Sequence, residues 1–346
     1  MTVPNVFVAV PLSPQSLHML ERGLRNANLI RASDALPPQQ FPADHVGDQA
    51  FRRDSSAQVS WDEGMRAADF LLGIPGDGPQ GVREIVSKCE NIKWVQGTAA
   101  GTAEKLEKSE VPQEMLSTIA WTSTSGVHAK PLAEFSLAAA LYARKDFDVL
   151  QKNMVQELWP PRWVMGSLHN NEVHILGAGN IALEIADTFQ RNGARVTVFS
   201  RKHLVNPIGF RWSPISELTS TLQQCDILIN TLPGGELTNK LISTEIFSML
   251  GSNAIFISVG RGTVVDQEAL LRSLDSERFR YAILDVTNPE PLPASHPLWH
   301  HPRVLISPHT AALSENEDDL IVELFLKNLD RIKSGELLIN RIDLSQ

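Results

Sequence analysis

The chain has 346 residues, 42% of them hydrophobic and 21% charged, a balance typical of a globular protein that buries a sizeable core. Because this length exceeds that of one average domain, two domains are expected. The net charge is −9 and no basic tract is present, so nucleic acid and anionic membrane surfaces are not expected as partners.

The N-terminus shows no basic segment followed by an apolar run, and no apolar run of about 18 residues occurs, so neither a signal peptide nor a membrane span is expected. The two cysteines, Cys89 and Cys225, lie far apart in sequence and in no spacing typical of a metal site. This cysteine usage suits a reducing compartment. We therefore expect a cytoplasmic protein without a bound metal.

The first part of the chain alternates between strand-like and helix-like patterns, which predicts a small α/β domain with a parallel sheet. After one of the strands come Gly97-Thr98-Ala99-Ala100-Gly101, small residues whose backbone N–H groups can face a ligand at the carboxyl end of a sheet. The strands are predicted at residues 6–10, 70–74, 92–96 and 119–122, and the helices at 16–24 and 82–88.

A long apolar helix is predicted from Leu132 to about Arg144. Its apolar character extends around much of the helix, which indicates burial on more than one side. Two kinds of partner fit this pattern: a second subunit of a homodimer, or the rest of the same subunit. The loop Trp159–Trp163 then leads into the next strand.

The segment Val173–Ala182, with the sequence VHILGAGNIA, has the pattern of a dinucleotide fingerprint. An apolar strand runs into Gly177, and a helix begins just beyond Gly179. Gly177 allows the tight turn, and Gly179 lets a pyrophosphate approach the backbone where free N–H groups and the helix dipole favour negative charge. The glycines of an ordinary turn are the alternative, but the flanking strand, helix and second strand at residues 195–199 favour nucleotide binding.

The alternation continues to the end of the chain and predicts a doubly wound domain with two mononucleotide-binding halves. A helix is predicted from residue 215, and the final helix from Glu317 to about Lys333. The other predicted elements are strands at residues 226–230, 255–259, 281–285 and 304–307, and a helix at 267–274.

Three chargeable residues lie at or just after predicted strand ends, where ligands bind in open α/β sheets. Arg261 is flanked by glycines, and its guanidinium suits bidentate binding of a carboxylate. Glu290 lies in a proline-rich loop that would hold its carboxylate in place, and His309 follows Pro308. A histidine paired with a carboxylate can act as a general acid. Each residue alone fits a surface or structural role, but together at successive strand ends they favour a catalytic site.

At this point the chain resembles the D-isomer-specific 2-hydroxyacid dehydrogenase family of the NAD(P)-binding type. The resemblance covers most of the chain and is strongest from about Ile119 to Thr310. The separations of the three chargeable residues, 290 − 261 = 29 and 309 − 290 = 19, also resemble those of the family. The shared motifs are Gly126-Val127-His128-Ala129 with Ala133-Glu134, the fingerprint, Thr231-Leu232-Pro233, Val259-Gly260-Arg261-Gly262 with Asp266, Leu284-Asp285-Val286, Glu290-Pro291-Leu292 and Ser307-Pro308-His309.

The resemblance implies a split architecture and a usually homodimeric protein. Residues 1–125 and 313–346 would form a smaller, flavodoxin-like α/β substrate domain. Residues 126–312 would form an inserted Rossmann-type domain that binds NAD(P), with the substrate in the cleft.

The resemblance also implies roles for single residues. Arg261 would bind the substrate, Glu290 would orient the histidine, and His309 would be the general acid/base in reduction of a small 2-oxo acid. The substrate carboxylate would lie on Arg261 and on backbone N–H groups around Ala99, Ala100 and Gly101. The implied cofactor-binding residues are Gly177, Ala178, Gly179, Asn180, Ile181, Ser200, Arg201, Lys202, Thr231, Leu232, Pro233, Val259, Gly260 and Asp285.

The end of the second strand of the fingerprint domain bears on the choice of cofactor. An NAD enzyme places an acidic residue about 20 positions past the fingerprint to bind the ribose 2′-OH. Here 200 − 177 = 23, and Ser200-Arg201-Lys202 occupies that place, with two cations and no carboxylate. We therefore predict that NADP(H) is preferred and that NAD(H) is the weaker cofactor.

Two departures from the family pattern concern the substrate. Thr102-Ala103 follows Gly101 where the family often has an aspartate, and Ser258 stands where an asparagine often precedes the arginine turn. By analogy with the family, the expected enzyme is a glyoxylate/hydroxypyruvate reductase. The alternatives are a reductase of a bulkier 2-oxo acid and a corepressor-like dinucleotide sensor.

Overall fold

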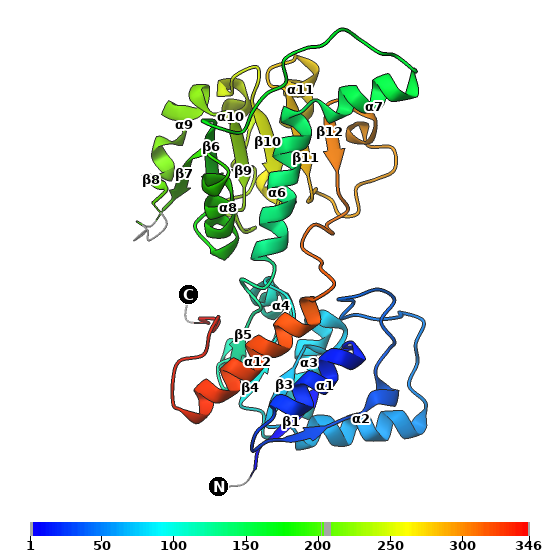
Figure 1. Cartoon of the computed structure of the whole chain (residues 1–346). Helices are drawn as coiled ribbons and strands as arrows, with labels where there is room; N and C mark the ends of the chain where they lie inside the picture. Colours follow the sequence, from blue (N-terminus) through cyan, green and yellow to red (C-terminus); the bar gives the residue numbers. More distant parts are fainter. Residues whose placement is uncertain (1–2, 202, 204–208, 345–346) are drawn as a thin grey trace. The chain divides into compact units, whose positions relative to one another are not determined.

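The computed structural model describes residues 3–201, 203 and 209–344 (Figure 1). The chain divides into two compact units: unit 1 consists of Met1–His128 with Leu313–Gln346, and unit 2 consists of Ala129–Ala312. The chain passes from unit 1 to unit 2 after His128 and returns to unit 1 at Leu313. The division expected from the sequence is after residue 125 and at residue 313. No helix in the described ranges combines the length and the apolar character needed to cross a membrane.

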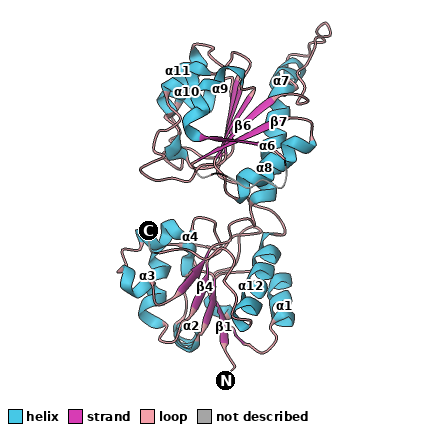
Figure 2. Ribbon diagram, turned by 90° about the vertical axis from the view of Figure 1, so that its left-hand side faces the viewer, coloured by secondary structure: helices cyan, strands magenta, loops and turns pink. Residues whose placement is uncertain are grey.

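Unit 1 is built on a five-stranded parallel sheet in the order β2-β1-β3-β4-β5. Figure 2 shows helices on both sides of this sheet. The strands are β1 (Asn5–Val8), β2 (Asn28–Ile30), β3 (Phe70–Leu72), β4 (Trp94–Gln96) and β5 (Ala120–Thr122). The helices are α1 (Pro14–Gly23), α2 (Ser55–Ala67), α3 (Pro79–Lys88), α4 (Thr102–Lys108), α5 (Gln113–Leu116) and α12 (Glu317–Lys333).

Alternate side chains of these short strands enter two cores, because successive residues of a strand point to opposite faces. On one face Phe7 and Leu71 pack with Trp61 of α2 and the apolar sides of α3 and α4. On the other face Trp94 stacks on Phe325 of α12 with ring centroids 4.5 Å apart, next to α1. The last helix of the chain therefore supplies a large share of one core of unit 1.

Unit 2 contains a seven-stranded parallel sheet in the order β12-β11-β10-β9-β6-β7-β8, the doubly wound arrangement that the sequence predicts. The strands are β6 (Glu172–Leu176), β7 (Arg195–Ser200), β8 (Arg211–Pro214), β9 (Ile227–Asn230), β10 (Ile255–Ser258), β11 (Tyr281–Leu284) and β12 (Val304–Ile306). The helices are α6 (Ala129–Arg144), α7 (Phe147–Val155), α8 (Asn180–Arg191), α9 (Leu218–Thr221), α10 (Thr244–Met249) and α11 (Gln267–Asp275).

Helices cover both faces of the unit 2 sheet. Helices α6 and α8 pack on one face through residues such as Ala140 and Ile185, and helices α9, α10 and α11 pack on the other through residues such as Phe247 and Leu270. One side of α6 is thus buried within its own subunit. The sequence pattern allowed either this arrangement or burial against a second subunit.

Candidate active site

The fingerprint turn follows β6, at the centre of the unit 2 sheet. Gly177 adopts φ +113°, in the left-handed region that side chains avoid. A Cβ at this position would also lie 2.6 Å from the Thr231 hydroxyl oxygen. Only glycine fits here, because both the turn and the close approach of the segment after β9 exclude a side chain.

The entrance to α8 is open. A Cβ on Gly179 would meet no atom within 4 Å, and no side chain caps the helix at this residue. The positive end of the α8 helix dipole therefore lies at a backbone position that a ligand can approach closely. Ala182 is fully buried between helix and sheet, where a larger side chain would push the helix away. These features fit the pyrophosphate of a dinucleotide.

Strand β7, next to β6, ends at the residues that are expected to determine the preference between NADP(H) and NAD(H). Ser200 is buried at the end of β7, and its hydroxyl accepts a hydrogen bond from the indole N–H of Trp212 at 2.8 Å. Arg201 follows with an exposed side chain. Lys202, the second predicted cation, lies outside the described residues. Trp212 belongs to β8, a strand that the sequence pattern does not reveal.

Within β6, His174 is buried against Phe199, with ring centroids 5.0 Å apart. Burial lowers the pKa of this histidine from about 6.5 to about 4. Between these pH values His174 is protonated in the unfolded chain and neutral in the folded chain. The free energy of unfolding therefore decreases as the pH falls from 6.5 to 4. The expected loss is about 3 kcal/mol at pH 4.

We expect His174→Leu, which removes the titrating group at similar volume, to flatten this pH dependence. The measurement is the urea midpoint between pH 7 and pH 4 for the variant and the wild-type protein. His18→Leu, at an exposed position of α1, is the matched control and keeps the wild-type slope. An unchanged slope in His174→Leu would assign the acid sensitivity to other groups.

The arginine turn follows β10, the neighbour of β11. A Cβ on Gly262 would lie 1.8 Å from the backbone carbonyl oxygen of Thr287, so these two backbone segments are in direct contact. This contact fixes the turn that carries Arg261 against the loop after β11. The Arg261 guanidinium donates a hydrogen bond to the Gly260 carbonyl oxygen at 2.9 Å, and the residue is partly buried.

Glu290 and His309 form a hydrogen-bonded pair. The Nδ1–H of His309 donates to Glu290 Oε2 at 2.9 Å, while Glu290 Oε1 accepts the backbone N–H of Thr287 at 3.0 Å. The carboxylate is thus held at both oxygens, and the paired nitrogen leaves Nε2 of the ring for a reacting group. The side chain of His309 is 46% exposed and that of Glu290 is 38% exposed, so the imidazole ring is accessible to a ligand.

The backbone of His309 is held in an unusual conformation. Its φ is +55°, which costs free energy in a residue with a Cβ and persists where the surroundings impose it. The buried Asp285 supplies this constraint: its carbonyl oxygen accepts the His309 N–H at 2.9 Å. Its carboxylate Oδ1 accepts the Ser307 hydroxyl and the N–H groups of Thr310 and Ala311 at 2.7, 3.1 and 3.1 Å. The family resemblance implies only a cofactor-binding role for Asp285. The structure adds that Asp285 also fixes the loop that carries His309.

The remaining predicted cofactor segments follow β9 and β10, side by side in the sheet. Thr231 donates its hydroxyl hydrogen to the Leu176 carbonyl oxygen at 2.8 Å, which joins this segment to the fingerprint strand. A Cβ on Gly260 would lie 2.5 Å from the Leu232 carbonyl oxygen, so the segments 231–233 and 259–260 are packed backbone to backbone.

In unit 1, the predicted substrate loop follows β4. The carbonyl oxygen of Ala99 accepts the Thr102 hydroxyl at 2.6 Å, and Ala100 is exposed. Among the described residues, no acceptor is recorded for the N–H groups of Ala99, Ala100 and Gly101. Successive N–H groups at such a turn form an anion-binding concavity.

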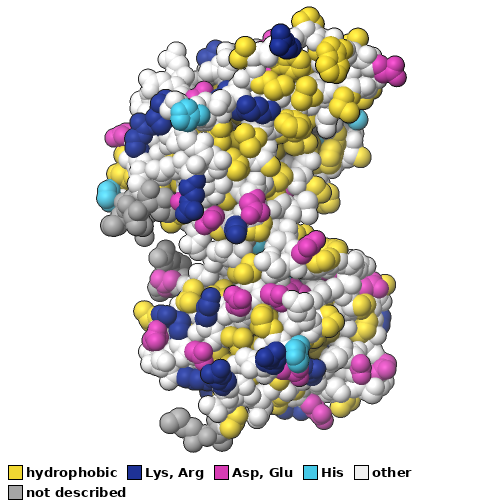
Figure 3. Space-filling model, in the orientation of Figure 1, with side chains coloured by type: hydrophobic (Ala, Val, Ile, Leu, Met, Phe, Trp, Pro, Cys, Tyr) yellow, Lys and Arg dark blue, Asp and Glu magenta, His cyan; other side chains and the backbone are white. Residues whose placement is uncertain are grey.

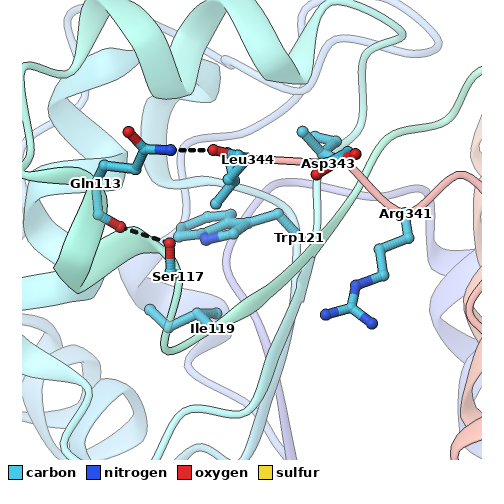
Figure 4. Close-up of a pocket in the computed structure, with 8 residues that line it drawn as sticks. Gln113, Ser117, Ile119, Trp121, Arg341, Asp343 and Leu344 are labelled. Atoms are coloured by element: carbon cyan, nitrogen blue, oxygen red, sulfur yellow. Dashed lines mark hydrogen bonds between the residues drawn. The ribbon is translucent and has the colours of Figure 1, made fainter. Parts of the chain in front are cut away.

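A cavity of about 530 Å³ lies elsewhere in unit 1, between β5, α5 and the C-terminal segment (Figure 4). Trp121, Ile119 and Arg341 contribute to its lining, and none of the predicted site residues does. It is therefore distinct from the candidate active site.

A doubly wound sheet with this open fingerprint turn defines a dinucleotide-binding protein, and the charged residues after β10, β11 and β12 add a chemical centre to it. A family model, "D-isomer specific 2-hydroxyacid dehydrogenase, NAD binding domain", matches residues 137–311, just over half of the chain. The chain belongs to this family and is an NAD(P)-dependent D-2-hydroxyacid dehydrogenase, as the sequence motifs indicate.

Three known proteins illustrate the relationship. An uncharacterized protein from the proB 3′ region of Corynebacterium melassecola is 27% identical over 291 residues, which cover 81% of this chain and 90% of that protein. The solved structure of a D-isomer specific 2-hydroxyacid dehydrogenase family protein from Aeromonas salmonicida has a TM-score of 0.79 at 22% identity, covering 99% of this chain and 100% of that one.

An NADPH-dependent glyoxylate/hydroxypyruvate reductase from Sinorhizobium meliloti, solved with NADP and sulfate, has a TM-score of 0.76 at 20% identity and covers 99% of this chain and 98% of that one. At these identities the solved structures show a shared fold.

Proposed function

We propose that the protein is an NADP(H)-preferring reductase that converts a small 2-oxo acid, such as glyoxylate or hydroxypyruvate, to the D-2-hydroxy acid. The observation that carries this proposal is the Glu290–His309 pair at 2.9 Å, beside the loop that fixes the Arg261 turn. In this proposal unit 2 binds the cofactor, and unit 1 supplies the loop for the substrate carboxylate. The glyoxylate/hydroxypyruvate reductase with the same fold supports the substrate class.

Each residue has a distinct role in the proposed reduction. NADPH, held at the fingerprint turn around Gly177 and Gly179, would supply the hydride for the reduction. Arg261 binds the substrate carboxylate through its guanidinium. His309 donates its Nε2 proton to the oxygen that becomes the hydroxyl, and Glu290 stabilises the imidazolium and fixes the ring through Nδ1.

The direct test supplies purified protein with NADPH and, in separate assays, glyoxylate, hydroxypyruvate and a bulky branched 2-oxo acid, while NADPH absorbance is followed. We expect oxidation of NADPH with at least one of the two small acids. Turnover of the bulky acid alone would move the assignment to a reductase of larger substrates. Tight NADPH binding without turnover of any acid would favour a dinucleotide sensor.

The cofactor preference is predicted to depend on Arg201, the exposed cation after β7. Arg201→Asp replaces a partner of the 2′-phosphate by a group that repels it and that binds a ribose 2′-OH. We expect the ratio of kcat/KM for NADPH to kcat/KM for NADH to fall about 10- to 100-fold, since a hydrogen bond to a charged group contributes about 1.5–3 kcal/mol. Arg191→Asp, at an exposed position late in α8, is the control and leaves the ratio unchanged. Equal ratios in both variants would remove Arg201 from the cofactor site.

The proposed assembly is a homodimer, supported by an apolar surface on α7 and the segment that follows it. No residue of α7 is buried. Val155 is 86% exposed and Trp159 is 99% exposed. Apolar side chains that gather on the surface in this way usually mark an interface. Figure 3 shows hydrophobic side chains gathered on the surface of unit 2 around α7.

We expect the wild-type protein to have the mass of two chains by light scattering, and Val155→Asp with Trp159→Asp to have the mass of one. A charge placed in a buried apolar interface is strongly destabilising for association. Met115→Asp, at another exposed apolar residue, in unit 1, is the control and remains a dimer. A monomeric wild-type protein would contradict the assembly.

Both cysteines are buried and unpaired, and burial raises the pKa of the Cys89 thiol to about 12. Free thiols kept in the core are typical of a reducing compartment. This supports the proposed cytoplasmic location.

A further inference from the structure

Four titratable side chains form a buried cluster in unit 1, outside the residues assigned to the reaction. Glu317 and Asp318 begin α12, and they are 2% and 4% exposed. His45 lies in the long segment between β2 and α2. His128 is the last residue of unit 1 before the chain enters α6. We call these four residues the α12 cluster.

Each histidine of the α12 cluster faces a carboxylate. His128 Nε2 lies 3.0 Å from Glu317 Oε1, and His45 Nε2 lies 2.9 Å from Asp318 Oδ1. His45 Nδ1 is also 3.9 Å from Glu317 Oε1, so its ring lies between the two carboxylates. In the described part of the chain, no group of three or more His, Cys, Asp or Glu side chains has the arrangement of a metal site. The cluster is therefore held together by its own histidine–carboxylate contacts.

Several loops converge on the first turn of α12 through these carboxylates. Asp318 Oδ2 accepts the backbone N–H of Ser13 at 2.8 Å and the side-chain amide of Gln39 at 3.1 Å. The carboxylate of Glu317 is hydrogen-bonded to His128, the last residue of the segment after β5. These loops follow β1, β2 and β5, so all of them lie at the carboxyl edge of the unit 1 sheet, where the loop after β4 also lies.

One contact extends from this cluster toward the predicted substrate loop. The backbone N–H of Thr124, four residues before His128, donates to the Ala99 carbonyl oxygen at 3.4 Å. Thr124 is fully buried, and Ser123 and His128 are buried as well, so both ends of the segment 123–128 are packed into unit 1. The bond between His128 and Glu317 therefore ties the segment that supports Ala99 to the helix by which the chain re-enters unit 1.

We propose that His128 and Glu317 are positioning residues for substrate binding: they fix the segment 123–128 and, through it, the backbone N–H groups of residues 99–101. This inference rests on the proposed function. A buried polar side chain adds little net stability, because its desolvation cost offsets the hydrogen bond that it gains. A role in fixing one loop arrangement accounts for burying four such side chains where the loops after β1, β2 and β5 meet.

The test compares His128→Leu with His128→Gln. The leucine removes the donor to Glu317, whereas the glutamine side chain retains an N–H donor of similar reach. We expect His128→Leu to lower kcat/KM for the 2-oxo acid about tenfold, because small displacements of substrate-positioning groups are costly. His128→Gln recovers most of this loss. The Kd for NADPH stays unchanged in both variants, because every assigned cofactor residue lies in unit 2.

Leu329→Ala is the matched control, because it creates a cavity further along α12 without touching the cluster. It lowers the Tm of the protein and leaves kcat/KM unchanged. The inference is overturned if His128→Leu leaves kcat/KM at the wild-type value, or if Leu329→Ala reduces it as much. Glu317→Leu, which removes the acceptor of the His128 N–H, is the second variant, should His128→Leu not fold, and we expect the same loss with it.

A wild-type protein that reduces no 2-oxo acid contradicts the proposed function, and amide hydrogen exchange then tests the inference by itself. Faster exchange of residues 97–101 and 123–128 in His128→Leu than in Leu329→Ala supports the positioning role. Equal exchange in the two variants overturns it.

Discussion

His309→Ala is expected to lower kcat about 100- to 10,000-fold, because a positioned general acid contributes an effect of this size. The alanine removes the ring that Glu290 orients at 2.9 Å, and water in its place has no fixed orientation. Binding of NADPH is expected to persist, since the fingerprint turn at Gly177 lies on another strand of the sheet. Steady-state kinetics and fluorescence titration with NADPH measure the two quantities separately.

Two further variants separate catalysis from loss of structure. Glu290→Gln keeps the shape of the orienting side chain and removes its charge, so kcat is expected to fall less than in His309→Ala. His300→Ala changes an exposed histidine of the neighbouring loop and is expected to leave kcat unchanged. A His309→Ala protein with wild-type kcat would exclude the histidine from the reaction.

Arg261→Gln is expected to lower kcat/KM for the 2-oxo acid by about 100- to 1,000-fold. A bidentate guanidinium–carboxylate contact consists of two charge-assisted hydrogen bonds, each contributing about 1.5–3 kcal/mol, and glutamine offers one neutral donor instead. Arg261→Lys keeps the charge without the planar fork, so an intermediate loss is expected. The measurement is the initial rate over a range of substrate concentrations at saturating NADPH.

The control for this prediction is Arg272→Gln, an exposed arginine of α11. We expect it to match the wild-type protein in kcat/KM. An Arg261→Gln variant with an unchanged kcat/KM would show that another cation binds the substrate carboxylate. An equal loss with a carboxylate substrate and with an uncharged ketone would show that the arginine acts on structure and not on the carboxylate.

The sequence predicts the fold class and the central part of unit 2 because their signals are local. The fingerprint at Gly177, the strand before it and the helix after it are contiguous, and apolar runs identify the strands that are buried on both faces. The final helix, Glu317–Lys333, is predicted with its observed bounds because its apolar stripe is complete. These predictions of fold class and family are confirmed.

Elements without a buried apolar face are not predicted from the sequence pattern. Helix α7 has no buried residue, so no core-facing stripe distinguishes it. Strand β8 is a short edge strand that contains arginine and proline, neither of which is typical of a strand interior. Long-range contacts are also invisible to local patterns: His128 and Glu317 are 189 positions apart, and His45 and Asp318 are 273 apart.

The place of α12 in the chain bears on the order in which the protein is completed during synthesis. Unit 2 is one continuous stretch, so all of its residues are synthesised before Leu313. Unit 1 still lacks Phe325 at that moment, and with it the ring that stacks on Trp94. The N-terminal part of unit 1 is therefore made first but completed last, because one face of its sheet lacks the side chains of α12 until the C-terminal segment is available.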